Sequence, residues 1–387
     1  MRVLAVLPLV PYPPDQGDRL RAWEMLTALA AHGSLTAALV VPDAPSPPSV
    51  DAIRALPAEV RVVVLPRLAR LRGAVAGALA GRPPAITAWW DRRAAADLQA
   101  ALASPTDPWD LACAFQFRAA PYVRRLPARV RALEMTDALG LYRRQLPWSG
   151  RALRQRLALR GVEALERRWP RDFDRAWIAA EADAAWVERL SGSRPTVVPN
   201  GCLPVSEPAP YRPDGPVLFL GNMRYPPNED AALWLAREVW PAVRTAAPAA
   251  ILRLVGVPSP AVAALAGRPG VEVAGRVPDV AVELAAASVV VNPVRFGTGT
   301  NRKVLDAWAA ARPVVSTPTG VRGFPCADGQ QVLLASTPDQ WVARLGWIRE
   351  HPAEAGDLGR RGWRFAQTAA DSRAAWAEAL AAADRGG

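Results

Sequence analysis

The sequence is poor in histidine and cysteine and has no long apolar run, and each scarcity excludes a class of protein. Two histidines, His32 and His351, are too few for a multi-histidine metal site. Three cysteines stand far apart without a CxxC pair, which supports neither a disulfide framework nor a zinc site. No segment has about 20 consecutive apolar residues, and Pro8 interrupts the short N-terminal run. We therefore expect no signal peptide or membrane span, and a cytoplasmic protein.

Lysine is almost absent, because Lys303 is the single lysine among 47 lysine and arginine residues. Arginine evidently serves wherever only positive charge is needed. A lone lysine therefore indicates a position that requires a compact, flexible ammonium group. The alternative is that it occurs by chance. The net charge of +11 favours anionic partners such as nucleotides, nucleic acid or a membrane face. The basic residues are dispersed and no nucleic-acid-binding motif is present, so we do not expect nucleic acid as a partner.

Apolar segments alternate with helical ones, which is the pattern of βαβ units and a parallel sheet. Val3–Leu9 predicts a buried strand, the next segment predicts a helix that ends at His32, and Leu35–Val41 predicts another strand. Five prolines mark 204–216 as a linker, after which the alternation restarts at Val217. Further strands are expected at Val60–Leu65, Leu111–Phe115, Val130–Glu134, Ala176–Ala179, Val197–Val198, Val217–Leu220, Ala250–Val255, Val271–Val273, Ser288–Val291, Val314–Ser316 and Val332–Leu334, and helices at Arg151–Arg168, Glu229–Ala246, Arg302–Ala311, 338–350 and 353–383.

The pattern predicts two α/β domains in series, 1–203 and 217–365, followed by a helical segment at 366–387. Two doubly wound domains that face each other would leave a cleft at the carboxyl ends of their strands, where such folds bind ligands.

The most informative segment is 288–323. An apolar strand ends at Pro293, a loop with Gly297 and Gly299 follows, and a helix begins near Asn301. Glycines let the backbone approach a ligand closely, and the start of a helix offers unpaired N–H groups at the positive end of its dipole. The segment therefore predicts an anion site, with a tight turn carrying solvated charges as the alternative.

Two cations stand in the first turn of this helix. Arg302 and Lys303 oppose the helix dipole, and a bound diphosphate would turn that cost into a gain. Asp306 lies one turn further on, where a carboxylate is placed to hold ribose hydroxyls.

The segment resembles the donor-binding motif of the family 4 glycosyltransferases, and it is most similar to the branch linked to exopolysaccharide sugar transfer. The similarity lies in Lys303-Val-Leu-Asp306-Ala307 and in the strand Arg312–Thr317 that follows. It implies the GT-B fold: two Rossmann-like, doubly wound domains facing a cleft, the donor held by the C-terminal domain, and a last helix that crosses back to the N-terminal domain. Many members carry Glu-x7-Glu here. This chain has Thr298 and Asp306 instead, and the first acid contacts the donor sugar in the family, so its loss bears on donor identity and activity.

Three other stretches are similar to the family. The loop from Gly221 to Asn228 follows a strand, and Asn228 is also expected to cap the next helix. Leu252–Pro260 and Val271–Val280 resemble the stretch that wraps the nucleotide base. Val197–Gly201 resembles an interdomain signature and is also a good turn. The resemblance implies donor-binding roles for Gly221, Asn222, Arg224, Asn228, Gly256, Arg276, Val277, Gly297, Thr298, Gly299, Thr300 and Asn301.

The resemblance is weaker in the N-terminal half. Gly17, Asp18 and Arg19 precede a helix where relatives approach the donor phosphates and the acceptor, and an ordinary loop with Asp18 as the N-cap is the alternative. Phe115–Arg118 ends a strand where relatives often carry a histidine, and neither histidine here fits that role. Acidic side chains that follow strands are further candidates, without a general base being assigned among them: Glu134, Asp137, Glu181 and Asp183.

Asp172 and Asp174 match the Asp-x-Asp that holds a metal ion in the other major glycosyltransferase fold. GT-B enzymes need no such motif, so we expect no metal site here. Two basic, leucine-containing segments, 67–82 and 151–171, fit peripheral contact with an anionic bilayer, with solvated surface helices as the alternative.

The resemblance implies a retaining, metal-independent, hexosyltransferase-like enzyme without a cofactor. It would move a sugar from a nucleotide-diphosphate-sugar donor to a glycan, lipid-linked or small-molecule acceptor, with Lys303 and Arg302 stabilising the departing diphosphate. One alternative is a degenerate GT-B protein that binds nucleotide or serves as a scaffold, for which Thr298 is the argument. Another is a GT-B epimerase, whose acid and base residues cannot be placed in this sequence.

Overall fold

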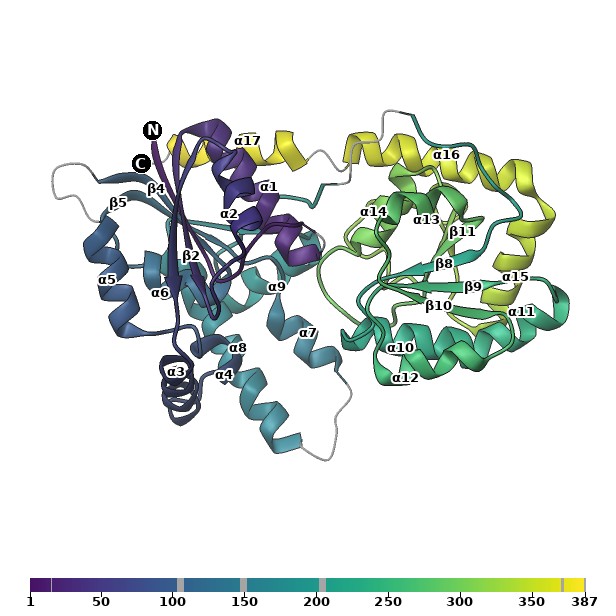
Figure 1. Ribbon diagram of the computed structural model, residues 1–387, viewed down its shortest axis with the longest axis horizontal. Coiled ribbons are helices and arrows are strands. Elements are labelled where there is room, and N and C mark those ends of the chain that lie inside the picture. The colour runs from purple at the N-terminus through teal and green to yellow at the C-terminus, as the bar shows by residue number, and fades with distance from the viewer. Residues whose placement is uncertain (15, 103–107, 147–151, 202–206, 370–371, 386–387) are drawn as a thin grey trace. The chain divides into compact units, whose positions relative to one another are not determined.

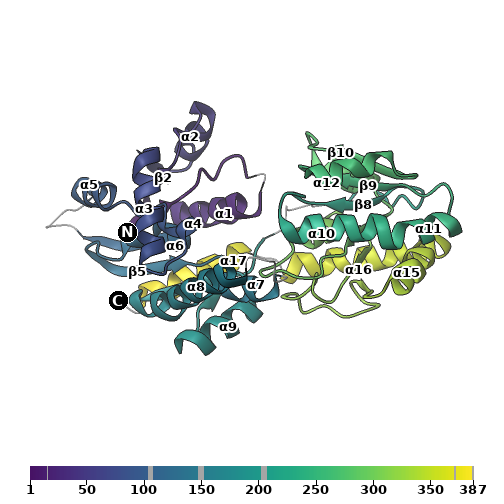
Figure 2. The same cartoon turned by 90° about the horizontal axis from the view of Figure 1, so that it is seen from below.

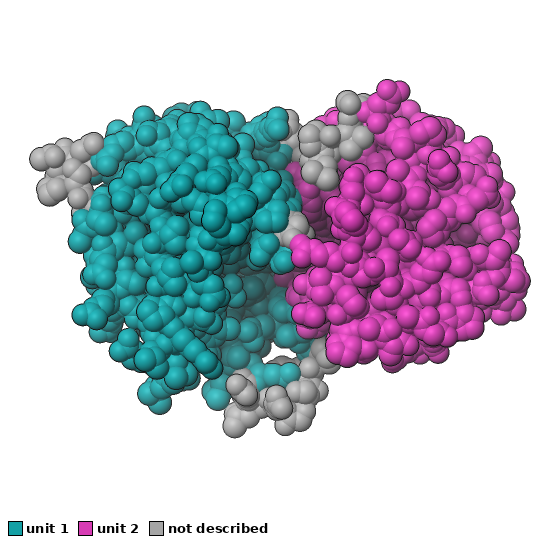
Figure 3. All heavy atoms as spheres, viewed as in Figure 1, with its two compact units in different colours: residues 1–199, 372–387 teal, residues 200–371 magenta. Residues whose placement is uncertain are grey.

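The structure is a computed structural model that describes residues 1–14, 16–102, 108–146, 152–201, 207–369 and 372–385. Residues 204–206 of the expected linker and the first residue of the helix expected at 151–168 lie outside the described residues. Figure 1 and, from below, Figure 2 show a sheet at the centre of each half of the chain, with helices on both of its faces. The chain divides into two compact units, coloured separately in Figure 3: unit 1 is Met1–Pro199 with Ser372–Gly387, and unit 2 is Asn200–Asp371.

The sheet of unit 1 has seven strands, all paired in parallel, in the order β3-β2-β1-β4-β5-β6-β7. Alternate residues of β1 enter two different clusters: Leu4 and Val6 pack on one face, Val3 and Ala5 on the other. A sheet covered on both faces explains the near-continuous apolar runs in the sequence. The strands are β1 (Arg2–Leu7), β2 (Ser34–Val41), β3 (Ala58–Val64), β4 (Trp109–Phe115), β5 (Ala128–Glu134), β6 (Arg175–Ile178) and β7 (Thr196–Val197).

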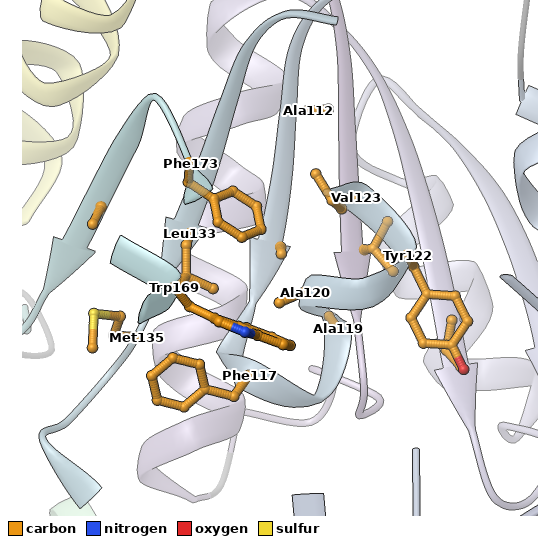
Figure 4. Packing of buried hydrophobic residues seen from close by; sticks show 14 of the residues in the cluster. Ala112, Phe117, Ala119, Ala120, Tyr122, Val123, Leu133, Met135, Trp169 and Phe173 are labelled. Carbon is orange, nitrogen blue, oxygen red and sulfur yellow. The ribbon is translucent and has the colours of Figure 1, made fainter. Parts of the chain in front are cut away.

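The helices of unit 1 cover this sheet with aromatic side chains. Figure 4 shows one such cluster, in which the Trp169 ring lies beside Phe117, their centroids 5.7 Å apart and nearly perpendicular. This edge-to-face contact is a favoured arrangement of aromatic rings. The helices are α1 (Gly17–His32), α2 (Pro47–Arg54), α3 (Arg67–Leu79), α4 (Pro84–Thr87), α5 (Arg92–Leu102), α6 (Gln116–Val123), α7 (Leu139–Gln145), α8 (Ala152–Asp172), α9 (Glu181–Ser191) and α17 (Ser372–Asp384).

The last helix, α17, packs on unit 1 although it follows unit 2 in the sequence. Trp376 is 1% exposed, and its ring meets that of Trp177 edge-on at 5.3 Å. At the far end of the helix, His32 and Asp384 lie 2.9 Å apart. The C-terminal helix thus joins the core of the first unit, in agreement with the GT-B expectation.

The sheet of unit 2 has six parallel strands in the order β10-β9-β8-β11-β12-β13. Two Rossmann-like sheets confirm the expected α/β class. The strands are β8 (Val217–Leu220), β9 (Leu252–Val255), β10 (Val271–Gly275), β11 (Val289–Asn292), β12 (Val314–Ser316) and β13 (Leu333–Leu334). The helices are α10 (Pro226–Trp234), a π-helical turn (Leu235–Val239), α11 (Trp240–Ala246), α12 (Pro260–Ala263), a 3₁₀ turn (Ala264–Gly267), α13 (Val280–Ala286), α14 (Arg302–Ala309), α15 (Pro338–Glu350) and α16 (Pro352–Ala369).

Two predicted helix caps are wrong. The helix α10 begins at Pro226, so Tyr225 is its N-cap and Asn228 stands inside its first turn. Proline is favoured at the first helical position, and the Pro226-Pro227 pair sets the start ahead of Asn228. The helix α1 likewise begins at Gly17, which places Asp18 in the first turn and not at the cap. The helix expected at 353–383 is described as α16 and α17, and residues 370–371 between them lie outside the described part.

Candidate functional site

In unit 2 the strand order reverses between β8 and β11, which are neighbours in the sheet although β9 and β10 lie between them in the sequence. Doubly wound sheets bind ligands at such a switch point, beyond the carboxyl ends of the strands. The loop after β8 contains Gly221 and Asn222, and the loop after β11 contains Gly297 and Gly299. The structure therefore gathers the predicted donor-site residues of both loops at one edge of the sheet.

Lys303 connects the two loops. Its Nζ donates a hydrogen bond to Asn228 Oδ1 at 2.7 Å and lies 4.9 Å from the centre of the Phe219 ring. The Nδ2 of Asn228 in turn donates to the Asn222 carbonyl oxygen at 3.0 Å. Burial lowers the pKa of Lys303 to about 7. The chain thus holds a buried ammonium group in the first turn of α14, where the helix dipole disfavours it and an anion would stabilise it.

Arg302 is engaged differently from its neighbour. Its Nη1 donates to the Gly201 carbonyl oxygen at 3.2 Å, and its Nε lies 3.3 Å from Asp306 Oδ1, one turn along the same helix. Burial raises the pKa of Asp306, and the nearby Arg302 opposes that shift. Since Arg302 is already paired with a carboxylate, Lys303 is the better placed of the two for a diphosphate.

The glycine-rich loop before α14 has backbone angles that residues other than glycine rarely adopt. Gly297 has φ 146° and Gly299 has φ 70°, conformations that favour glycine. Arg322 donates to the Gly297 carbonyl oxygen, and Asn200 Nδ2 donates to Thr300 Oγ1 at 2.7 Å. These contacts fix the loop that carries Thr298 and ends at Asn301, the N-cap of α14.

The strand ends beside this loop come close together. A Cβ atom on Gly256 would lie 1.9 Å from the Gly221 carbonyl oxygen, so a side chain at 256 would displace the loop after β8. Arg276 and Val277 follow β10, the edge strand, with Arg276 exposed and Val277 partly buried. Arg224 is also exposed, in the turn between β8 and α10, where its N–H donates to Asn222 Oδ1 at 3.1 Å.

Sequence reasoning missed two residues that support the site. Asn292, the last residue of β11, is fully buried, and its Nδ2 donates to the Gly320 carbonyl oxygen at 2.9 Å. Arg322 precedes Gly323 in a second glycine-containing loop. This position beside a glycine is the only indication of its role that the sequence offers. The turn at Asn200 and Gly201 also contributes, through its contacts to Thr300 and Arg302.

Unit 1 has its own switch point, between β1 and β4. Gly17 has open space where a Cβ would stand, and Asp18 Oδ1 accepts a hydrogen bond from the N–H of Arg19 at 2.9 Å. Burial lowers the pKa of Arg118, in α6, and the carboxylate of Asp18 opposes that shift. The first turns of α1 and α6, which follow β1 and β4, thus bring Asp18 near enough to Arg118 for their charges to interact.

Acidic residues gather after β5 and β6 in unit 1. Burial and the nearby Asp183 raise the pKa of Asp137 to about 7. Asp183 is 1% exposed, in the first turn of α9. Glu134 is fully buried and forms a bidentate pair with Arg21, each N–O distance being 3.1 Å. Glu181 is instead an exposed residue that pairs with Arg194.

Asp172 and Asp174 are held by arginines. Asp172 lies 3.1 Å from Arg124 and 3.2 Å from Arg168, and Asp174 lies 3.3 Å from Arg131. Over the described ranges, no cluster of three or more histidine, cysteine, aspartate or glutamate side chains has an arrangement suited to a metal ion. No helix in the described part of the chain has the length and apolar content needed to cross a bilayer.

Two Rossmann-like units, with glycine loops at the switch point of the second, define a protein of GT-B architecture. Residues 215–350 match the family described as "Glycosyl transferases group 1". That match falls on unit 2, the unit that carries the Lys303 site. The domain and the fold together support a glycosyltransferase.

Solved structures share the fold over nearly the whole chain. Sucrose-phosphate synthase from Thermosynechococcus elongatus is 17% identical with a TM-score of 0.67, over 98% of this chain and 97% of that one. HepE from Anabaena, in complex with UDP and glucose, is 14% identical with a TM-score of 0.65, over 99% and 98%. WaaG, a glycosyltransferase involved in lipopolysaccharide biosynthesis, is 14% identical with a TM-score of 0.64, over 99% of each chain. A search of curated proteins gave no match. At these identities the likeness shows the fold, and the predicted GT-B architecture is confirmed.

Proposed function

We propose that the protein is a family 4 glycosyltransferase of the exopolysaccharide-associated branch. It transfers a sugar, with retention and without a metal ion, from a nucleotide-diphosphate sugar to a glycan, lipid-linked or small-molecule acceptor. The observation that carries the proposal is the ammonium group of Lys303, held by Asn228 at 2.7 Å in the first turn of α14. Retention and the acceptor classes follow from the family resemblance of the Lys303–Asp306 motif.

The leaving group of such a transfer is a nucleoside diphosphate, whose negative charge grows as the sugar departs. Preorganised positive charge is the largest single source of stabilisation for such a group. Lys303, the N–H groups at the start of α14 and the backbone of the Gly297–Thr300 loop supply it in this chain. Asp306 lies one turn on, on the same helix, and is the candidate for the ribose hydroxyls.

HepE has been crystallised with UDP and with UDP-glucose, so UDP is the first nucleotide to test. We expect the purified protein to be stabilised selectively by one nucleoside diphosphate among UDP, GDP, ADP and TDP. A ligand at 100 times its dissociation constant adds about 2.7 kcal/mol to the free energy of unfolding, which a thermal-shift assay resolves. The matching monophosphate is the control, because it lacks the second phosphate.

If none of the diphosphates stabilises the protein at millimolar concentration, the proposed donor site is contradicted. A nucleotide that binds while no nucleotide sugar of the same base turns over would favour the degenerate GT-B protein instead, the alternative that Thr298 suggests.

Nucleotide affinity should depend on pH, because burial lowers the pKa of Lys303 to about 7. Above that pH the free protein loses the ammonium proton, and a diphosphate that needs the charged form must restore it. We therefore expect the association constant to fall by up to about tenfold per pH unit above pH 7. Phosphate groups have their second pKa near 6, so the ligand itself does not change over this range. The measurement is isothermal titration calorimetry in buffers of different ionisation enthalpy.

The matched control is Lys303→Arg, which stays charged throughout the range and should flatten the profile. The stability of the protein without nucleotide provides a second test, because it should change with pH in the opposite direction to the affinity. Between pH 7 and about 10.4 the unfolded chain binds a proton that folded Lys303 does not, so this residue makes the free energy of unfolding rise with pH. A wild-type affinity that is constant from pH 7 to 9 would contradict the role given to Lys303.

A further inference from the structure

Helix α3 turns its large apolar side chains to solvent. Leu68, Leu71, Val75 and Leu79 are 70%, 59%, 51% and 86% exposed, and they recur at intervals of three and four residues. Residues at this spacing lie on one face of a helix. The face is therefore a continuous apolar stripe without a partner in the described part of unit 1.

The opposite face of α3 explains this orientation. A Cβ on Gly73 would lie 2.4 Å from the Thr87 carbonyl oxygen, and a Cβ on Gly77 would lie 1.9 Å from Thr87 Oγ1. The small residues thus let α3 approach α4 too closely for any larger side chain to fit between them. A helix on a protein surface normally buries its large apolar residues. This one packs Gly73 and Gly77 against α4 and exposes its leucines.

Positive charge surrounds the stripe. From Val60 to Trp90 the sequence contains five arginines and no acidic residue. Arg67 and Arg72 are exposed on either side of the stripe, one residue before Leu68 and one after Leu71. A leucine stripe flanked by arginines, in a segment without acidic residues, complements a surface whose outer layer is anionic and whose interior is apolar.

The first half of α8 adds to the same surface. Leu157 is 55% exposed, between the exposed residues Arg156 and Arg160. One turn further on, a Cβ on Gly161 would lie 2.6 Å from the Gly81 carbonyl oxygen, just beyond the end of α3. The sequence from Ala138 to Val162 again lacks acidic residues. Figure 1 shows α3 and the start of α8 at the same lower edge of unit 1.

We propose that α3 and the first half of α8 form a surface that docks the protein on an anionic lipid bilayer. The leucines of α3 enter the boundary between headgroups and acyl chains, and Arg67 and Arg72 meet the lipid phosphates. Charge complementarity favours an anionic lipid surface, because every charged residue from Val60 to Trp90 is an arginine. The proposal is independent of the donor site in unit 2.

The test is flotation of the full chain with vesicles of phosphatidylcholine alone and of phosphatidylcholine mixed with phosphatidylglycerol. We expect binding to the mixed vesicles only, weakened by salt. The pair Arg67→Gln and Arg72→Gln should lower the partition coefficient by about 25-fold, since each arginine near an anionic surface contributes about fivefold. The pair Leu71→Gln and Leu79→Gln should lower it by at least about tenfold.

Matched controls come from unit 2. Val282, in α13, is 64% exposed, and Arg237 is also exposed, so Val282→Gln and Arg237→Gln should leave vesicle binding unchanged. Nucleotide binding and the melting temperature of each α3 variant show that it has folded. The proposal is overturned if the wild type ignores anionic vesicles, or if the folded α3 variants bind them as the wild type does. It is also overturned if light scattering shows a dimer that the leucine substitutions dissociate, because the stripe would then join two copies of the chain.

Discussion

Replacing Lys303 with methionine is expected to lower the rate of sugar transfer by about 100- to 1000-fold, the usual cost of one preorganised group that stabilises a departing charge. Lys303 lies in the first turn of α14, where Asn228 holds its ammonium group at 2.7 Å. Methionine keeps the length of the side chain and removes the charge. The readout is the release of nucleoside diphosphate from the donor sugar whose base the binding screen selects.

The stability of this variant separates a chemical role from a structural one. Burial already lowers the pKa of Lys303, so the folded protein gains little from its charge in the absence of ligand. The melting temperature of Lys303→Met without nucleotide should therefore equal or exceed that of the wild type. The exposed Arg349, in α15, provides the control: Arg349→Met should preserve transfer. Full activity in Lys303→Met would refute the assignment of the leaving-group site.

The sequence predicted the glycine loop and the start of α14 because their signals are local. Glycines, a helix start and cations in the first turn all fall between Gly297 and Lys303. The partner of Lys303 could not be found in that way, because Asn228 lies 75 positions earlier in the chain. Its own local signal pointed to a helix cap, and the Pro226-Pro227 pair moved the start of α10 and freed the Asn228 side chain for Lys303.

The N-terminal unit was harder to predict for the same reason. Periodicity placed a helix after β1 and did not show that Arg21 would be buried against Glu134, a contact across 113 positions. The outward face of α3 was equally hidden, because a leucine-containing helix in a sequence usually packs inward. Only the close approach of Gly73 and Gly77 to Thr87 shows which face is covered.

Arg21→Met is expected to destabilise unit 1 by about 3–5 kcal/mol, because it leaves a buried carboxylate without its partner. Arg21 and Glu134 are 1% and 0% exposed, and two N–O distances of 3.1 Å join them. The same guanidinium donates to the Val198 carbonyl oxygen at 2.6 Å and lies 4.8 Å from the ring centre of Trp376 in α17. The measurement is the urea unfolding midpoint, followed by tryptophan fluorescence.

Two further variants and the pH dependence of unfolding test whether the unpaired charge of Glu134 causes this loss of stability. Arg54 and Asp51 form an exposed pair at 3.6 Å in the same unit, so Arg54→Met should cost no more than about 1 kcal/mol. Adding Glu134→Leu to Arg21→Met should recover much of the loss, since the unpaired buried charge disappears. Burial raises the pKa of Glu134 and Arg21 opposes that shift, so without Arg21 the carboxyl takes up a proton more readily. The deficit of Arg21→Met should then shrink as the pH falls, and a deficit that is independent of pH would assign the loss to packing against Trp376 instead of to charge.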